Sequence, residues 1–116
     1  MAIRPHLVTF SVPVDDLSAA ADFYRQLLGK EPVEPTPGKL EFELVNGAWL
    51  QLNGDPAEDG KPARVLLSVD DIESAVADAK ESGAEVGDIE SFADLLAWAE
   101  GTGPGGQRFS LIAVKR

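Results

Sequence analysis

The chain offers few residues for catalysis, and these few exclude several kinds of site. Its 116 residues include one histidine, His6, and no cysteine. Zinc–thiolate, iron–sulfur and cysteine-nucleophile sites are therefore excluded, as is any site that takes two histidines from one chain. His6 is the only imidazole available to Ser11, Ser68 and Ser110, and no serine-nucleophile constellation stands out. We interpret His6 as a surface residue at the end of a strand.

Carboxylates are plentiful, and two acidic pairs stand where helix caps belong. Asp15-Asp16 and Asp70-Asp71 each open a predicted helix, where a carboxylate accepts hydrogen bonds from free amides and complements the helix dipole. This explanation is simpler than a metal site. Glu41 and Glu43 share one face of a predicted strand, and we interpret them as a solvated face rather than a cation site. No feature selects one carboxylate as a general acid or base.

The net charge of the chain argues against polyanionic partners. Ten Lys and Arg against twenty Asp and Glu give a formal net charge of −10. Such a charge repels DNA, RNA and anionic membranes. Hydrophobic residues make up 44% of the chain, enough for the core of one domain. No apolar run reaches the length of a membrane span and the N-terminus lacks a signal-peptide pattern, so we expect a cytoplasmic domain.

The N-terminal region predicts a strand and then a helix. β-branched and apolar residues favour a strand over 7–14. A helix is predicted over 15–29, because acidic residues open it and Gly29 follows its last apolar pair. Helical spacing assigns its buried face to Leu17, Ala20, Ala21, Tyr24, Leu27 and Leu28.

A hairpin and a linker are predicted next. A weak strand covers 31–34, where prolines limit pairing. Strands over 40–44 and 48–53 flank Asn46-Gly47, a strong signal for a hairpin turn. Residues 54–63 lack apolar periodicity and contain two glycines and two prolines, which indicates an exposed linker.

The pattern then repeats. The sequence from Val14 to Ala20 matches the sequence from Val69 to Ala75, which lies 55 residues later. The second copy predicts, in order, a strand over 64–69, a helix over 70–83, a short strand over 84–86 and a final strand over 107–114. Between them, 92–100 has the propensity of a helix but the position of a strand. We follow the repeat and predict a strand over 95–99.

Two motifs within these copies resemble a known family. Phe23-Tyr24-Arg25-Gln26-Leu27-Leu28-Gly29 resembles a motif of the glyoxalase / bleomycin-resistance protein / extradiol dioxygenase superfamily, the vicinal-oxygen-chelate proteins. The stretch from Leu67 to Ile72 resembles the start of that family's second module, and Gly103-Pro104-Gly105-Gly106 stands where the family usually has Asp-Pro-Asp-Gly. The resemblance covers nearly the whole chain.

The resemblance implies an α+β fold in one domain spanning residues 1–116. Two βαβββ modules, over about 5–53 and 64–114 and joined by the linker 54–63, would form a curved, mixed, eight-stranded sheet with helices on its outer face. It also implies a homodimer, because family members of this size are commonly dimers. Neither the resemblance nor the residues decide whether the two chains exchange modules.

Family enzymes hold a divalent metal on His, Glu or Gln side chains at four strand positions, and these positions can be compared with this chain. They fall on Thr9, Gln51, Arg64 and Ser110. None is histidine or a carboxylate, Gln51 alone is a weak ligand, and the guanidinium of Arg64 repels cations. We therefore expect no metal and no other cofactor.

Alternate residues of a strand share a face, so the residues two positions away from these four would lie on the same face. Together they resemble the lining of a ligand site, which is mostly neutral with a few placed polar groups. Either tryptophan can stack on a planar ligand, although core packing explains each equally well. Arg64 can pair with a ligand carboxylate or phosphate, or with an acid of the protein itself. The predicted ligand-binding residues are Thr9, Ser11, Trp49, Gln51, Arg64, Leu66, Trp98, Arg108 and Ser110.

Three functions are compatible with this sequence. The first is a metal-independent small-molecule-binding protein similar to the bleomycin-resistance branch, with antibiotics among its candidate ligands. Its acidic charge would favour a cationic compound. The second is an enzyme of the same family, either a metal-dependent glyoxalase-like or dioxygenase-like enzyme or a metal-free acid–base catalyst. The third is an accessory or regulatory module with an occluded groove. The missing ligands favour the first and argue against an enzyme.

Overall fold

The computed structural model describes residues 2–115, which divide into two compact units. The first unit is Thr9–Ala63, and the second comprises the residues from Arg64 onward together with the N-terminal residues through Val8. In chain order the elements are β1 (Leu7–Pro13), α1 (Leu17–Leu28), β2 (Val33–Thr36), β3 (Lys39–Val45), β4 (Ala48–Asn53), the 3-10 turn η1 (Pro56–Glu58), β5 (Arg64–Ser68), α2 (Ile72–Glu81), β6 (Glu85–Val86), β7 (Glu90–Phe92), β8 (Leu96–Thr102) and β9 (Arg108–Val114).

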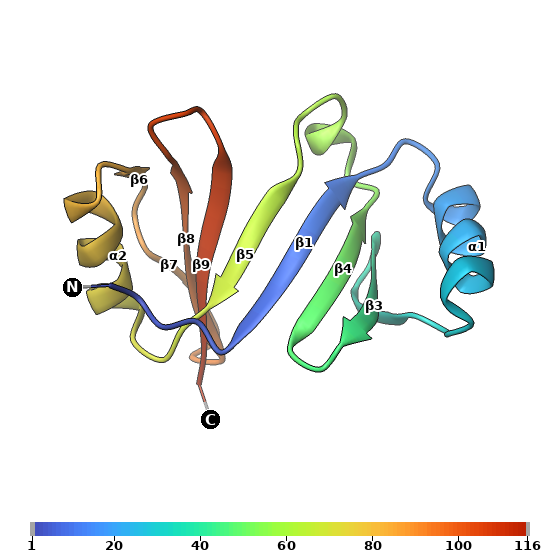
Figure 1. Ribbon diagram of the computed structural model, residues 1–116, viewed down its shortest axis with the longest axis horizontal. Helices are drawn as coiled ribbons and strands as arrows, with labels where there is room; N and C mark the ends of the chain where they lie inside the picture. The colour runs from blue at the N-terminus through green and yellow to red at the C-terminus, as the bar shows by residue number, and fades with distance from the viewer. Residues whose placement is uncertain (1, 116) are drawn as a thin grey trace. The chain divides into compact units, whose positions relative to one another are not determined.

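In the first unit, α1 packs on one face of strands in the order β2-β3-β4-β1 (Figure 1). Strands β3 and β4 form the predicted hairpin, in which Val45 pairs with Ala48 around Asn46-Gly47. Gly47 has a φ of 87°, a conformation that glycine adopts without steric cost. The core between helix and strands contains Ala21, Phe42, Leu50 and Leu52.

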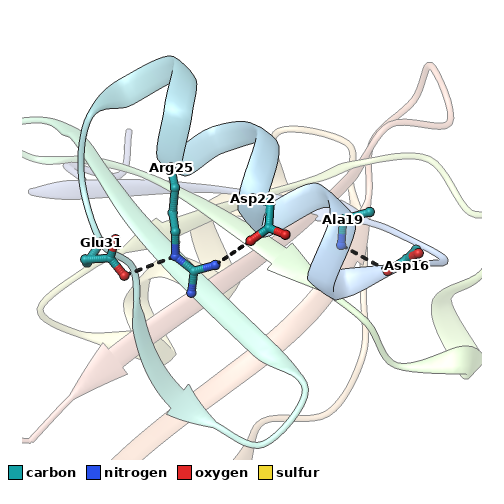
Figure 2. Close-up of polar contacts among 5 residues, drawn as sticks. All are labelled: Asp16, Ala19, Asp22, Arg25 and Glu31. Atoms are coloured by element: carbon teal, nitrogen blue, oxygen red, sulfur yellow. Dashed lines mark hydrogen bonds and ion pairs between the residues drawn. The ribbon is translucent and has the colours of Figure 1, made fainter.

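Both ends of α1 are capped as the sequence predicts. The Asp16 carboxylate accepts a hydrogen bond from the Ala19 amide at 3.0 Å (Figure 2). Gly29 ends the helix in the left-handed conformation, and its N–H donates to the Arg25 carbonyl at 2.9 Å. The capping role assigned to the first acidic pair is therefore confirmed for Asp16.

Two details of the first unit were predicted wrongly. Leu27 is 63% exposed. It lies roughly 100° around the helix from Leu28, at the edge of the apolar stripe. Only the part of that stripe that faces the strands is buried, and Leu27 lies outside it. The weak strand is Val33–Thr36 rather than 31–34. It lies at the end of the strand order, an edge position that tolerates the missing N–H of Pro35.

The second unit has the same plan, with α2 on one face of strands ordered β5-β9-β8-β6 (Figure 1). β5 and β9 are parallel, whereas β8 is antiparallel to β9, so this part of the sheet is mixed. The Asp71 carboxylate accepts from the Ser74 amide at 3.1 Å and caps α2. The core contains Val69, Ala75, Val76, Ala99 and Leu111.

The ambiguous segment 92–100 follows the repeat and not its helix propensity. It contributes to β8, which pairs with β9 from Leu96 to Thr102. β7 precedes it and pairs with β8 across a tight turn in which Ala93 and Asp94 have φ values of 48° and 57°. The α+β prediction with repeated strand–helix–strand units is confirmed, and β7 is a strand beyond the eight expected.

The segment predicted as a linker, 54–63, contains one short ordered turn. Asp55 caps η1 by accepting a hydrogen bond from the Ala57 amide at 3.0 Å. Among residues 2–115, neither helix has the length and apolar character needed to cross a bilayer.

Candidate ligand-binding faces

Polar side chains gather on the face of the first unit's strands that is turned away from α1. Leu40, Phe42 and Leu52 pack toward the helix, so the alternating residues of the same strands point to the other face. That face carries buried polar residues, each between 6% and 8% exposed: Thr9 and Ser11 on β1, and Gln51 and Asn53 on β4. A row of buried polar groups on a sheet face needs hydrogen-bond partners.

Gln51 is the centre of a hydrogen-bond chain across three strands. The Ser11 hydroxyl donates to Gln51 Oε1 at 2.8 Å, and Gln51 Nε2 donates to Glu41 Oε2 at 2.7 Å. Glu41 and Gln51 are direct cross-strand partners on β3 and β4. The two contacts hold the amide with its oxygen toward Ser11 and its nitrogen toward Glu41.

Asn53 has a local structural role instead. Its side-chain oxygen accepts from the Asp55 amide at 3.0 Å, at the start of the segment that follows β4. Trp49 lies on the same face as Gln51, because it pairs with Glu43 two positions along the strand. It is half-buried and lies outside the core against α1.

In the second unit, the face turned away from α2 carries the other predicted residues. Leu67, Ala99 and Leu111 pack toward the helix side, so their neighbours along each strand point away from it. Cross-strand register arranges these neighbours in four rows: Phe92, Leu96 and Val114; then Glu90, Trp98, Ile112 and Ser68; then Glu100, Ser110 and Leu66; then Thr102, Arg108 and Arg64.

Arg64 forms an ion pair on this face. Its guanidinium lies 3.1 Å from Glu100 Oε1, and the two side chains are 21% and 53% exposed. Arg108 is the direct register partner of Arg64 on the parallel strand β9. The face therefore presents two neighbouring guanidiniums at one end.

The structure divides the nine predicted ligand-binding residues between the two faces. Four belong to the first unit and five to the second, and within each unit they share one face. The first set is Thr9, Ser11, Trp49 and Gln51, and the second is Arg64, Leu66, Trp98, Arg108 and Ser110. The orientation of Trp98, which the sequence left open, is away from α2 and beside Ile112.

Two acidic residues that contact predicted site residues, Glu41 and Glu100, were not themselves predicted as site residues. Glu41 was interpreted as a solvated residue, and Glu100 was not singled out. A hairpin without irregularity would pair Glu41 with Leu52, but a shift in register between Glu43 and Val45 pairs it with Gln51. Glu100 lies two residues after Trp98 and therefore on the same face of β8. It is recognisable as a neighbour of the predicted site residues only once the register of β8 with β9 is known.

The resemblance assigns metal ligands to four positions, and the side chains at these positions do not fit a divalent ion. They carry two hydroxyls, one amide and one guanidinium, on Thr9, Ser110, Gln51 and Arg64. The amide is engaged by Ser11 and Glu41, and the guanidinium places a fixed positive charge beside Glu100. Within residues 2–115, no three His, Cys, Asp or Glu side chains form a group that could hold an ion.

Three open hollows lie near the helices, and none includes a predicted ligand-binding residue. One of about 720 Å³ surrounds the start of α1 beside Asp59, and one of about 780 Å³ lies between the start of α2 and the end of β9. A smaller one of about 340 Å³ lies at the end of α2 against Pro104 and Phe109.

Comparison with known proteins places the chain in a family. The sequence model of the Glyoxalase/Bleomycin resistance protein/Dioxygenase superfamily matches residues 5–92. A curated relative, the cadmium-induced protein CadI of Mycobacterium tuberculosis, is 30% identical in an alignment that covers 92% of this chain and 75% of CadI.

Solved structures share the fold at lower identity. Methylmalonyl-CoA epimerase of Streptomyces coelicolor, crystallised as a variant with 2-nitronate-propionyl-CoA, is 18% identical with a TM-score of 0.67, over 99% of this chain and all of that one. A superfamily member from Vibrio splendidus is also 18% identical with a TM-score of 0.67, over 98% of this chain and all of that one. On the match of residues 5–92 and the likeness to CadI, this chain belongs to the glyoxalase/bleomycin resistance protein/dioxygenase superfamily.

Proposed function

We propose that the chain is a small-molecule-binding protein that works without a metal, with antibiotics among its candidate ligands. The observation that carries the proposal is the donor set at Thr9, Gln51, Arg64 and Ser110, which lacks any carboxylate or imidazole. Metal chemistry needs several such donors converging at bond distance. What remains is a pair of sheet faces with ordered polar groups and a tryptophan on each.

The chemistry of these faces supports binding. Gln51 is held by Ser11 and Glu41, so it can offer directed hydrogen bonds at little entropic cost. Trp49 and Trp98 lie outside the two hydrophobic cores, which leaves their rings for contact with a ligand. The nine predicted residues remain our proposed ligand contacts.

A thermal-shift screen in EDTA tests this function directly. The full chain is mixed with a panel of planar, cationic, anionic and neutral compounds, and the hits are titrated by calorimetry with and without added metal. We expect at least one ligand whose Kd is the same in both conditions. Cd²⁺ belongs in the metal series because the name of CadI links that relative to cadmium. Hits that bind only with metal would contradict the proposal.

A second candidate, metal-free acid–base catalysis, is favoured by one contact. Glu41 is the carboxylate that touches Gln51, so it is the group positioned to exchange a proton with a ligand on this face. Deuterium uptake from heavy water into a bound ligand, lost in Glu41→Gln, would support this candidate. Binding without any exchange would leave the non-enzymatic function.

The proposal includes a homodimer and a cytoplasmic location. Exposed apolar side chains such as Phe23 and Leu27 on α1, 58% and 63% exposed, are compatible with a covered surface in an assembly. Light scattering on the eluting protein measures its mass, and we expect twice that of one chain. Fractionation of cells that express the chain tests the compartment.

A further inference from the structure

Both asparagines of this chain precede a glycine. They are Asn46, followed by Gly47, and Asn53, followed by Gly54. In such a pair the backbone nitrogen of the glycine can attack the side-chain carbonyl carbon of the asparagine, and glycine has no Cβ to obstruct the approach. Asn46 lies in the turn before β4, and Asn53 is the last residue of that strand. The same chemistry can therefore be compared in two environments within one unit.

The hairpin turn leaves the reacting groups of Asn46 and Gly47 free. Asn46 is exposed, and the two residues connect Val45 with Ala48, the strand pair nearest the turn. Among residues 2–115, neither the Asn46 side chain nor the Gly47 N–H has a hydrogen-bond partner. The side chain can therefore rotate until its carbonyl carbon meets the Gly47 nitrogen, without breaking any contact that stabilises the fold.

Asn53 has the same following residue but lacks this freedom. It is 7% exposed, and its Oδ1 accepts a hydrogen bond from the Asp55 amide at 3.0 Å. The Gly54 N–H donates to the Gly38 carbonyl at 2.8 Å, so the attacking nitrogen is engaged. A Cβ on Gly54 would lie 3.3 Å from the side chain of Leu17, which shows how closely this site is packed. Reaction at Asn53 needs both hydrogen bonds to open first, and two bonds of ordinary strength slow it roughly thirtyfold.

We propose that Asn46 is a site of non-enzymatic deamidation and isomerisation in the folded chain, and that the fold protects Asn53 from the same reaction. The Gly47 nitrogen bonds to Asn46 Cγ, and the side-chain nitrogen leaves as ammonia with the proton that the Gly47 amide loses. Water then opens the five-membered succinimide at either of its two carbonyl groups. One opening gives aspartate, and the other gives isoaspartate, in which the backbone runs through the β-carbon. The sequence consumes one water and needs no oxidant or reductant.

The products change the end of the β3–β4 hairpin. Each adds a carboxylate there, and isoaspartate also lengthens the backbone of a two-residue turn whose glycine has a φ of 87°. Next to this turn Glu43 pairs with Trp49, so the turn helps to set the position of Trp49 on the first unit's face. The modification alters this end of the face irreversibly, and its extent increases with the age of the molecule. The inference does not depend on the proposed function.

The test follows both asparagines in the full chain, once folded and once unfolded in guanidinium chloride. The protein is incubated in mildly alkaline buffer, because attack needs the deprotonated amide nitrogen. Timed samples are digested with pepsin in acid, and fragment-ion mass spectrometry measures the loss of each side-chain amide. In the folded chain Asn46 should convert roughly thirtyfold faster than Asn53. In guanidinium chloride the two rates should become similar, because both pairs are then equally free.

Asn46→Gln is the matched control, because the imide that glutamine would form has a six-membered ring and closes far more slowly. Aged wild-type protein should contain acidic species on ion-exchange chromatography that this variant lacks. A methyltransferase specific for isoaspartate should label the aged wild-type chain and leave the variant unlabelled, since direct hydrolysis of the amide would give aspartate alone.

Three results would overturn the inference. Equal rates at Asn46 and Asn53 in the folded chain would show that the fold does not protect Asn53. A difference that persists in guanidinium chloride would assign the selectivity to the local sequence rather than to the structure. An aged chain without isoaspartate would exclude the succinimide. None of these readouts involves a ligand, so their failure leaves the proposed function untouched.

Discussion

Replacing Gln51 by leucine tests whether the polar chain on the first unit's face is an ordered part of the fold. The substitution removes the hydrogen bonds to Ser11 and to Glu41. A neutral hydrogen bond contributes about 1 kcal/mol and one to a charged group about 2 kcal/mol. Burying leucine at a position that is 8% exposed offsets about 1 kcal/mol. We expect a net loss of about 2 kcal/mol in the free energy of unfolding.

Urea unfolding followed by fluorescence measures this loss, with Ser11→Ala to complete a double-mutant cycle. Ser11→Ala alone should cost about 1 kcal/mol, and adding it to Gln51→Leu should cost almost nothing, since the bond is already absent. Gln26→Leu on the exposed side of α1 is the matched control and should change stability by less than about 0.5 kcal/mol. Gln51→Leu with unchanged stability, or fully additive costs, would refute the reasoning.

Three further predictions concern caps, turns and glycine packing, all measured by urea unfolding. Asp16→Ala removes the cap of α1 and should cost about 1 kcal/mol, whereas Asp16→Asn should retain most of it. Ala93→Gly should stabilise the chain by about 0.5 kcal/mol, because alanine at a φ of 48° is strained; destabilisation would contradict that turn geometry. Gly101→Ala should lower the free energy of unfolding by about 1 kcal/mol or more, as overpacking does, since its Cβ would lie 2.5 Å from the Phe109 ring. Gly87→Ala, whose Cβ meets only ordinary contacts, should not show that cost.

The internal repeat made most of the fold predictable. Matching Val14–Ala20 to the segment that begins at Val69 placed both helices, and both aspartate caps formed as expected. The repeat also predicted a strand correctly for the segment containing Trp98, although its residues have helix propensity. Pairing with β9 stabilises the strand by more than the helix propensity would stabilise a helix. β7 was missed because three residues of edge strand carry too little pattern to stand out.

The faces were harder to predict than the elements. Alternation along a strand assigns residues to faces, but partners across strands depend on register. One irregularity between Glu43 and Val45 moves Glu41 from opposite Leu52 to opposite Gln51. Apolar alternation favours the shifted register, because that register pairs Leu40 with Leu52 and Phe42 with Leu50 on the face toward α1. The pairing of Glu41 with Gln51 could therefore be predicted from alternation, whereas the hydrogen bonds through Gln51 are given only by the structure.

The most direct test of the central claim is the metal content of the untagged chain by elemental mass spectrometry. The protein is incubated with nickel, zinc, iron, manganese and cadmium in turn, and excess metal is removed before measurement. The donor set of Thr9, Gln51, Arg64 and Ser110 predicts far less than stoichiometric metal in every case. A content close to one ion per chain after removal of excess metal would contradict a metal-independent function.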